Sequence, residues 1–536
     1  MTKRSRLLAA SFLSIMSVPF VTACSGDSSG GSGNGSGGNG NSTSTGTSIG
    51  GASATGGVGV GGVTSPRTGT TTGTGVGTGG KSSASGGSAT SSSTSGNTGG
   101  SSTSTGGKTS ATGGSSTATG GKTSTAGGTT SGSGGKTNSA GGSTSASGGS
   151  TSGTGGAAVS CTLPKLPESS ALTTRNTKLP DPFTFFDGTK VTTKAQWECR
   201  RKEILAMAAK YIYGPVPGEP DDVTGTVSGG SVSINVKVGS KSETFSATIS
   251  GSGTAIALEL SGGIFPSSHK KLTFGTGFEA KIKSLFGLSE LNPNVANGWM
   301  IDRVMDVLEK NPSSGHDPTK VMVSGCSGCG KGAFLAGVFS RAPLVVIVES
   351  GGGGAASLRQ AEWFRHGAGK SVWQCADALP QSIDNLEANG ICGPWITNAA
   401  KWLTTSPDKV NNLPFDQHLL LATIAPRYLL HFSNNNGKNS WCHLGGTCEA
   451  LSAWAAEPVW NALGVPERMG FHQYSAGHCS APAEAVTLAG VFFKRVFEGN
   501  TSAKTDVMDI MANGVQQPVS EWKTMWVDWN METTLK

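Results

Sequence analysis

The run Val321-Met-Val-Ser-Gly-Cys-Ser-Gly-Cys-Gly-Lys-Gly-Ala333 says most about the fold of this 536-residue chain. Its β-branched first residues predict a short strand, and the glycines after them predict a tight turn. Small residues then continue from Lys331 to Phe339 in a pattern that is typical of a closely packed helix. A strand, a turn and a helix in this order place Ser327 on the turn, with its hydroxyl at the end of a central sheet.

A serine held in this way is the nucleophile elbow of the α/β-hydrolases. The turn needs small neighbours, here Gly325, Gly328 and Gly330, because a Cβ at these positions would clash with the strained backbone. The helix N-terminus that follows the turn favours developing negative charge. The run therefore predicts that Ser327 is a nucleophile.

Two other interpretations of this run stay open. Gly325 to Lys331 also fits the phosphate-loop spacing G-x-x-x-x-G-K, but a Walker loop continues with a Ser or Thr that holds magnesium, and this chain has Gly332. The run can also be a glycine-rich turn without chemistry. The nucleotide interpretation disagrees with the signs of export at the N-terminus, because nucleotides are scarce outside the cell.

Those signs begin with the basic start Met1-Thr-Lys-Arg-Ser-Arg6, which an apolar stretch from Leu7 to Ala23 follows. The pattern predicts a signal peptide over 1–23. Val21-Thr-Ala-Cys24 resembles a lipobox, in which Cys24 becomes the lipid-bearing N-terminus; the alternative is an ordinary signal peptide with a chance cysteine. We expect an exported protein, either a bacterial outer-membrane lipoprotein or a secreted protein. No later run is long and apolar enough to span a bilayer.

Residues 25–160 consist almost wholly of Gly, Ser, Thr and Ala and contain no aromatic residue. Such a segment cannot bury enough apolar surface to offset its chain entropy, so we expect a disordered linker. The linker supplies most of the 83 glycines and lowers the charged fraction of the whole chain to 14%. The net charge of +7 is too diffuse to indicate nucleic acid binding.

Residues 161–536 are long enough for one large α/β domain, which we expect to be catalytic. Helical spacing covers Trp197 to Tyr213 and Met300 to Leu308. Apolar or alternating runs predict strands, and helical patterns follow several of them: strands over 231–238, 245–249, 255–260, 344–348, 427–432 and 469–474, and helices near 450–463 and 484–497. Strands that alternate with helices indicate an α/β-hydrolase fold, with a mainly parallel sheet in a three-layer sandwich and antiparallel strands at its N-terminal edge.

A serine hydroxyl is a weak nucleophile and needs a base, an acid that orients the base, and donors for the oxyanion. Glu349 directly follows the expected strand 344–348 and precedes the glycines of Ser350-Gly-Gly-Gly-Gly354. Because ligand groups lie at the carboxyl ends of strands in such sheets, we expect Glu349 on the same rim as Ser327. The alternative for Glu349 is a solvated glutamate at a strand end.

His478 is the predicted base and lies in the loop after the last of these strands, although a plain surface histidine is the alternative. Cys326 precedes Ser327 and Cys479 follows His478, so we predict a disulfide between the two cysteines, which would bring nucleophile and base within reach. We expect three other histidines in the core: His418, His431 and His472. His443 lies in a loop and is a candidate substrate contact.

Nine cysteines follow the linker, which in an exported protein indicates disulfides and leaves at least one cysteine over. Cys326-Ser-Gly-Cys329 has no second Cys-x-x-Cys unit to accompany it, so we expect no zinc site. The pairing of the remaining cysteines stays open for Cys329, Cys375, Cys392, Cys442 and Cys448.

Together these residues resemble the glucuronoyl esterases, the fifteenth family of carbohydrate esterases. That family has Gly-Cys-Ser-Arg-x-Gly-Lys-Gly-Ala around its nucleophile, and Gly325 to Ala333 is similar. Its Glu-Ser-Gly-x-Gly-Gly and His-Cys motifs match Glu349 to Gly354 and His478-Cys479. Leu413 to Arg427 and Gln196-Trp-Glu-Cys-Arg200 also resemble segments of the family. The similarity covers most of 161–500.

The resemblance implies hydrolysis of 4-O-methyl-glucuronic acid esters of glucuronoxylan, including esters that join it to lignin, with no metal or other cofactor. It implies that Ser327 attacks the ester carbonyl, that His478 is the base and that Glu349 orients the base. It further implies substrate contacts from the side chains of Lys331, Trp441, Gln374 and Glu387. We expect a monomer that meets a membrane only through its N-terminal lipid.

The chain departs from the family directly after the serine, where the family's arginine helps to hold the oxyanion and this chain has Gly328. Losing one oxyanion donor costs about 3 kcal/mol in comparable hydrolases. The remaining candidates for the oxyanion hole are the backbone N–H groups of Gly328, Gly262 and Gly263. The departure leaves two alternatives, an esterase of the same fold with another substrate and an inactive carbohydrate-binding lipoprotein. The intact Ser-Glu-His set argues against the second alternative.

Two further expectations concern cysteines. We predict a disulfide between Cys161 and Cys199. Ser357 stands where fungal relatives have a disulfide cysteine, so Cys448 lacks that partner and pairs elsewhere or stays free.

Overall fold

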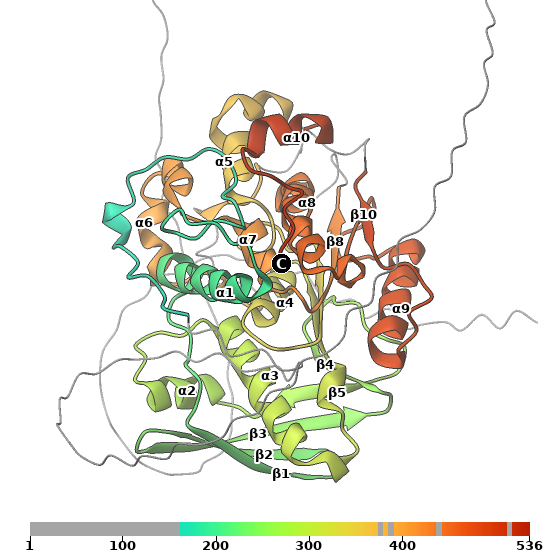
Figure 1. The fold of residues 1–536 in the computed structure, drawn as a ribbon. Coiled ribbons are helices and arrows are strands. Elements are labelled where there is room, and N and C mark those ends of the chain that lie inside the picture. Colours follow the sequence, from blue (N-terminus) through green and yellow to red (C-terminus); the bar gives the residue numbers. More distant parts are fainter. Residues whose placement is uncertain (1–160, 374–378, 384–390, 436–441, 512–516) are drawn as a thin grey trace, which may run out of the picture. The chain divides into compact units, whose positions relative to one another are not determined.

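The computed structural model describes residues 161–373, 379–383, 391–435, 442–511 and 517–536. In these residues the chain forms a ten-stranded sheet with helices around it (Figure 1). The strands are β1 (Asp222–Ser228), β2 (Ser231–Val238), β3 (Lys241–Gly251), β4 (Ala255–Glu259), β5 (His269–Phe274), β6 (Val321–Cys326), β7 (Leu344–Val348), β8 (Tyr428–Asn434), β9 (Met469–Tyr474) and β10 (Val507–Asp509). The helices are α1 (Lys194–Ala208), α2 (Phe278–Phe286), α3 (Pro293–Lys310), α4 (Gly328–Val338), α5 (Leu358–His366), α6 (Lys401–Thr404), α7 (Gln417–Ala422), α8 (Gly446–Leu463), α9 (Ala483–Glu498) and α10 (Val519–Trp526).

The sheet has the strand order β1-β2-β3-β5-β4-β6-β7-β8-β9-β10. The pairs β1–β2, β2–β3 and β3–β5 are antiparallel, and every pair from β5–β4 to β9–β10 is parallel. This topology confirms the expected mainly parallel sheet with antiparallel strands at its N-terminal edge.

The central strands are buried on both faces, which is why they read as continuous apolar runs. In β7, Val345 and Ile347 face a core that includes residues of α3, α4, α7 and α8. The alternate residues of β7, Leu344, Val346 and Val348, face a second core that includes residues of α9. Figure 1 shows α9 at the right, away from α3 and α4. The sheet therefore lies between two helical layers.

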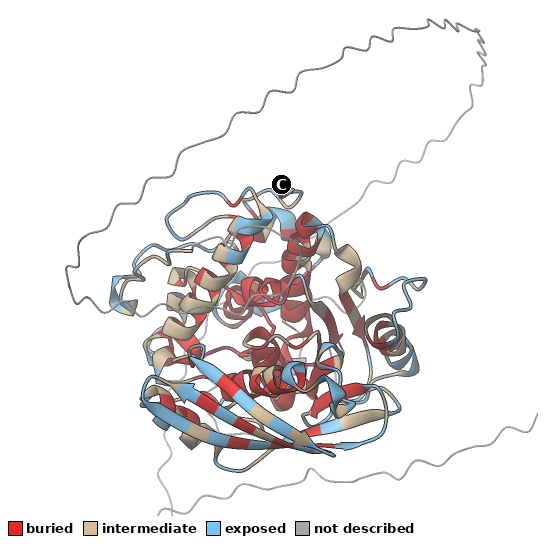
Figure 2. Cartoon of the chain, turned by 60° about the horizontal axis from the view of Figure 1, so that its bottom comes forward, coloured by how far each residue is buried: buried red, intermediate tan, exposed pale blue. Residues whose placement is uncertain are grey.

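The antiparallel edge is covered on one face only. In β2, Val232, Ile234 and Val236 are buried while their neighbours are more exposed, and Figure 2 shows this alternation along the strands at the bottom. β1 and β5 were not expected from the sequence, because β1 buries only Val223 and β5 only Leu272. Neither strand therefore shows the alternation of apolar and polar residues that predicts a strand.

The predicted bounds agree with the structure for β2, β7 and β9. α1 begins three residues before the expected helix because Thr193 and Gln196 form a capping box at its N-terminus. The rest of the expected helix is a π-helical turn over Ala209–Tyr213. Among the described residues we find no helix with the length and apolar character that a membrane crossing requires.

Candidate active site

Ser327 lies on the turn between β6 and α4, as the sequence predicts. Its backbone has φ 59° and ψ −123°, a positive φ that a serine keeps only where the surrounding structure enforces it. The Ser327 N–H donates to the carbonyl of Val348 at 3.0 Å, and the Ser327 carbonyl accepts from the N–H of Lys331 at 3.0 Å. The residue is partly exposed at the carboxyl end of the sheet, where ligand groups gather in such folds.

The glycines beside Ser327 permit close backbone approaches. A Cβ on Gly325 would lie 2.3 Å from the carbonyl oxygen of Cys329, and a Cβ on Gly330 would lie 2.4 Å from that of Val348. Both separations are below the 3.0 Å that real Cβ atoms respect. The sequence-based expectation that this turn requires glycine is therefore confirmed.

Glu349 directly follows β7 on the same rim, also with a positive φ of 45°. Its N–H donates to the carbonyl of Phe432 in β8 at 2.9 Å, which fixes the start of the loop that follows. The side chain is only 1% exposed, yet its carboxylate is surrounded by donors. The Tyr474 hydroxyl donates to Oε1 at 2.8 Å, Asn434 Nδ2 donates to Oε1 at 3.4 Å, and the Cys479 N–H lies 3.2 Å from both oxygens.

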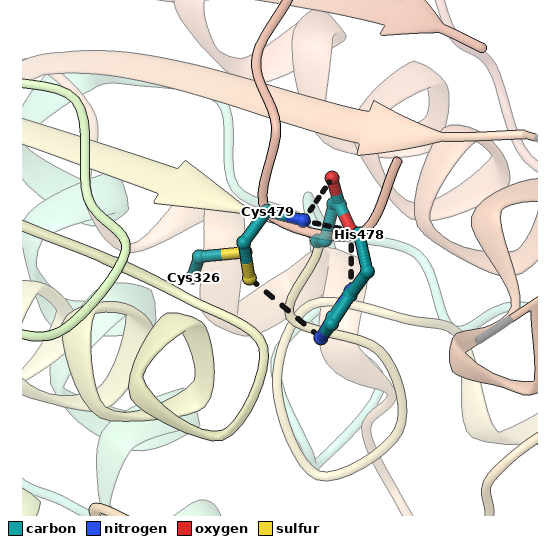
Figure 3. Close-up of side chains that lie close together, drawn as sticks. Cys326, His478 and Cys479 are labelled. Atoms are coloured by element: carbon teal, nitrogen blue, oxygen red, sulfur yellow. Dashed lines mark hydrogen bonds and ion pairs between the residues drawn. A yellow bond between two sulfur atoms is a disulfide. The ribbon is translucent and has the colours of Figure 1, made fainter. Parts of the chain in front are cut away.

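His478 lies on the loop after β9, with its Nδ1 2.8 Å from Oε2 of Glu349. A carboxylate oxygen only accepts, so Nδ1 carries the hydrogen of this contact, which in the neutral imidazole leaves the lone pair on Nε2. Nε2 lies 3.6 Å from Sγ of Cys479 (Figure 3). The imidazole is 18% exposed, so a ligand can reach it.

A disulfide joins Cys326 to Cys479, with their Cα atoms 5.8 Å apart (Figure 3). It connects the residue before Ser327 with the residue after His478, as the sequence analysis predicts. Gly262 packs against this bridge, because a Cβ there would lie 2.8 Å from Cβ of Cys326. The other predicted bridge, Cys161–Cys199, is also present.

Backbone N–H groups beside Ser327 can receive an oxyanion. Gly328 is the first residue of α4, where an N–H has no partner within the helix and the helix dipole favours negative charge. The loop after β4 is fastened to this turn, since the Cys326 N–H donates to the carbonyl of Ser261 at 2.9 Å. The Gly263 N–H is engaged in a local turn with the carbonyl of Leu260 at 3.3 Å.

The space beside Gly328 is filled. A Cβ on Gly328 would lie 2.6 Å from the carbonyl oxygen of Ile391 and 2.9 Å from Cζ2 of Trp395. The Trp395 indole Nε1 donates to the carbonyl of Gly328 at 3.0 Å. A third disulfide, Cys329–Cys392, fixes the segment 391–395 to α4. The sequence analysis left the partner of Cys329 open.

Lys331, which the resemblance assigns to the substrate, is 1% exposed. Its Nζ donates to the carbonyl of Ser350 at 2.6 Å and to Oε1 of Gln381 at 2.9 Å, and it lies 5.0 Å from the Trp395 ring centroid. Burial lowers the pKa of Lys331 to about 7, although the nearby Glu449 carboxylate acts in the opposite direction. Lys331 thus joins the nucleophile's helix to the loop after Glu349.

Sequence reasoning missed two residues of this region, Gln381 and Glu449. Oε1 of the buried Glu449 accepts from the Ser350 hydroxyl at 2.7 Å and from the Gly351 N–H at 2.9 Å, and lies 3.3 Å from Nε2 of His431. Burial raises the pKa of Glu449, but these donors outweigh burial and lower it overall. Neither residue belongs to a sequence pattern that could have identified it.

Of the three histidines expected in the core, His418 and His431 are fully buried, whereas the side chain of His472 is 13% exposed at the edge next to β10. His418 is fully buried with Nε2 2.8 Å from the carbonyl of Pro180, and burial lowers the pKa of His418 to about 4. His431 is fully buried, and His472 lies in β9 with Nδ1 2.7 Å from Asp509. The backbone of His443 supports the site, because its carbonyl accepts from the Gln381 N–H at 2.7 Å.

Several predicted residues lie outside the described part of the chain. These are the signal peptide 1–23, Cys24, the linker, Gln374, Cys375, Glu387 and Trp441, and the side chain of Cys442 is likewise outside it.

Cys448 is a buried free thiol, in agreement with one of the two outcomes expected for it. Burial and the nearby carboxylates raise the pKa of Cys448 well above its ordinary value. Four potential metal ligands converge at Cys326, Glu349, His478 and Cys479. The two sulfurs are bonded to each other, so this set does not fit a metal.

Residues 229–464 match a family model described as glucuronyl esterase of fungi. A 4-O-methyl-glucuronoyl methylesterase from Schizophyllum commune is 34% identical over 385 residues, which cover 67% of this chain and 91% of the relative. The enzyme of the same name from Neurospora crassa is 36% identical over 328 residues, covering 57% of this chain and 78% of that relative.

Solved structures of glucuronoyl esterases are also similar to this chain. The glucuronoyl esterase catalytic domain from Hypocrea jecorina has 31% identity and a TM-score of 0.56, covering 67% of this chain and 98% of that one. A serine-to-alanine variant of a glucuronoyl esterase from Sporotrichum thermophile, in complex with methyl 4-O-methyl-β-D-glucopyranuronate, also has 31% identity and a TM-score of 0.56, covering 68% and 98% of the two chains.

Proposed function

The chain belongs to the glucuronoyl esterase family and is therefore a carboxylic ester hydrolase, and from this we propose that it cleaves 4-O-methyl-glucuronoyl esters of glucuronoxylan, including those that join the polysaccharide to lignin. The observation that carries the proposal is the contact between Glu349 and His478, which the Cys326–Cys479 bridge connects to the Ser327 turn. The complex of the Sporotrichum thermophile relative supports the substrate class.

In the proposed mechanism, Nε2 of His478 takes the proton from the Ser327 hydroxyl as its oxygen attacks the ester carbonyl. Glu349 holds the imidazole through Nδ1 and stabilises the imidazolium that forms. The Gly328 N–H stabilises the negative oxygen of the tetrahedral intermediate. His478 then gives the proton to the departing alcohol, leaving a glucuronoyl ester on Ser327. In the second step His478 takes a proton from water, the water oxygen attacks this ester, and His478 returns the proton to Ser327 as the sugar acid leaves.

Lys331 is proposed to contact the sugar acid, together with Trp441, Gln374 and Glu387. Gln381 joins this proposed set because it accepts a hydrogen bond from the Lys331 ammonium. No metal or cofactor takes part in the proposed reaction, because every proton transfer has a named side chain.

The second candidate is an esterase of the same fold with another acyl or alcohol group. It is favoured by the surroundings of Gly328, where the Ile391 carbonyl and the Trp395 ring fill the space that a longer side chain would use. The proposed location of either enzyme is outside the cytoplasm, since disulfides of this kind persist in oxidising compartments and the N-terminus resembles an export signal with an acceptor at Cys24.

Hydrolysis of benzyl glucuronate tests the proposed function. We expect kcat/KM for benzyl glucuronate to exceed that for benzyl acetate and nitrophenyl acetate, with Ser327→Ala as the inactive control. Preference for the simple acetates contradicts the uronate substrate and favours the second candidate. If the protein hydrolyses none of these esters, the proposed esterase activity is contradicted.

A further inference from the structure

Trp395 stands beside the nucleophile and is attached to it through two neighbours. Its Nε1 donates to the carbonyl of Gly328 at 3.0 Å, and its ring centroid lies 5.0 Å from Nζ of Lys331. Gly328 directly follows Ser327, and Lys331 donates its N–H to the Ser327 carbonyl. The indole therefore contacts the first turn of α4, which directly follows the nucleophile.

The segment that carries Trp395 is fixed rather than loosely placed. The Cys329–Cys392 disulfide bonds it to the first turn of α4. Asn294 Nδ2 donates to the carbonyl of Cys392 at 2.9 Å, and Asn292 Nδ2 donates to that of Trp395 at 3.3 Å. Both asparagines are at most 1% exposed, so the donor of each bond is held in the core. A side chain held this firmly presents a constant surface to a ligand.

The three directions around the attacked carbonyl identify what Trp395 faces. The departing alcohol must lie near His478, which gives it a proton, and His478 is attached to residue 326 by the Cys479 bridge. The carbonyl oxygen must lie near the Gly328 N–H. We take the acyl group to extend past the first turn of α4, which carries Lys331 and contacts Trp395.

We propose that Trp395 is a specificity-determining residue that bounds the acyl side of the ester and offers its indole to a sugar acid, with the Cys329–Cys392 disulfide holding it in place. The inference rests on the proposed function and adds a residue to it. Indole surfaces suit the apolar face of a sugar ring, while the adjacent Lys331 ammonium suits its hydroxyl oxygens. Trp395 thus favours an acyl group that carries both.

Two substrate series separate this role from a merely structural one. The acyl series contains benzyl esters of glucuronic, 4-O-methyl-glucuronic and galacturonic acid; the alcohol series contains methyl, benzyl and phenylpropyl esters of glucuronic acid. Trp395→Phe keeps an aromatic ring without the N–H, and Trp395→Ala removes the ring. The matched control is Trp402→Phe, because Nε1 of Trp402 also donates to a backbone carbonyl, that of Tyr211 at 3.2 Å.

We expect Trp395→Ala to change the kcat/KM ratios within the acyl series by about tenfold or more. Trp395→Phe should change them by about threefold, the effect of one hydrogen bond. For both Trp395 variants, the kcat/KM ratios within the alcohol series should stay within about twofold of wild type. For Trp402→Phe, the ratios within both series should stay within about twofold of wild type. Equal changes in both series, or no change in the acyl series for either Trp395 variant, contradict the inference.

A second pair of variants keeps the test valid if Trp395→Ala does not fold. Cys329→Ser with Cys392→Ser should alter the acyl ratios in the same direction as Trp395→Phe. Cys161→Ser with Cys199→Ser removes a bridge between the N-terminal segment and α1 and should leave them unchanged. Acyl ratios that remain those of wild type in both double variants contradict the proposed role of the disulfide and with it the inference. A wild-type protein without activity on any glucuronate ester contradicts the proposed function itself, an outcome distinct from these.

Discussion

Glu349 and His478 are 129 residues apart in sequence, and their side chains meet at 2.8 Å between Oε2 and Nδ1. The contact forms because β7 and β9 end on the same rim of the sheet, where Glu349 follows β7 and the loop after β9 carries His478. The hydroxyl of Tyr474 holds the other carboxylate oxygen at 2.8 Å. The acid is therefore fixed on both sides before any ligand arrives.

Removing the acid should separate orientation from packing. We expect Glu349→Gln to lower kcat by about 10³- to 10⁴-fold, because the amide cannot hold His478 in the same tautomer or stabilise its imidazolium. Tyr474→Phe should lower kcat by roughly tenfold, since it removes one hydrogen bond to a buried carboxylate. Tyr211→Phe is the matched control, because its hydroxyl donates to the carbonyl of Pro167, in the N-terminal segment. Equal losses in the two tyrosine variants would contradict the assignment of Glu349.

Gly328→Arg tests whether the oxyanion region has been rebuilt. A Cβ at residue 328 would already lie 2.6 Å from the Ile391 carbonyl oxygen and 2.9 Å from the Trp395 ring. We expect activity on uronate esters to fall, with Gly328→Ala showing part of the loss. Gly490→Arg is the control, because a Cβ there meets nothing within 4 Å. A rise in kcat for Gly328→Arg would show that the space can accept the family's arginine.

The buried ammonium of Lys331 should give a measurable pH dependence. Burial lowers the pKa of Lys331 to about 7, so the charged form is present below that pH and is lost as the pH rises through it. If the charge holds the substrate, KM should rise over this range. Glu449→Gln should move the rise to lower pH, because the Glu449 charge holds the pKa of Lys331 up. A rise in KM that persists unchanged in Lys331→Met would assign it to another group.

The Cys326–Cys479 bridge should matter for both stability and activity. It spans 153 residues, and the chain-entropy model gives such a bridge on the order of 5 kcal/mol of unfolding free energy. The Cys161–Cys199 bridge spans 38 residues, for which the same model gives about 4 kcal/mol. We expect serine pairs at either bridge to lower the melting temperature. Only the Cys326 and Cys479 pair should also reduce activity at a temperature where both variants are folded.

The sequence was sufficient for the features that follow from local patterns. The elbow at Ser327 depends on glycines within a few residues of it, and the buried strands β6 and β7 read as apolar runs. His478 could be chosen among the histidines because Cys479 follows it and Cys326 precedes Ser327. These neighbours in sequence carry information about contacts in space.

The remaining features depend on long-range packing. β1, at the edge of the sheet, and β5, between β3 and β4, are polar strands with one buried apolar residue each, so alternation could not reveal them. The pairing of Cys329 with Cys392 spans 63 residues and has no adjacent motif to indicate it. Glu449 lies in the first turn of α8 and contacts Ser350 and Gly351, and Gln381 lies in a loop and contacts Lys331. Both contacts join residues far apart in sequence, so no local pattern indicates them.

The central claim is that Ser327 is the nucleophile of a glucuronoyl esterase. The most direct measurement is acid-quenched mass spectrometry of wild type and Ser327→Ala during turnover of benzyl glucuronate. We predict a glucuronoyl adduct on the wild-type peptide that contains Ser327, and for Ser327→Ala no adduct, an unchanged melting temperature and turnover reduced by about 10⁴-fold or more. An adduct on another residue, or turnover by Ser327→Ala at the wild-type rate, would contradict the claim.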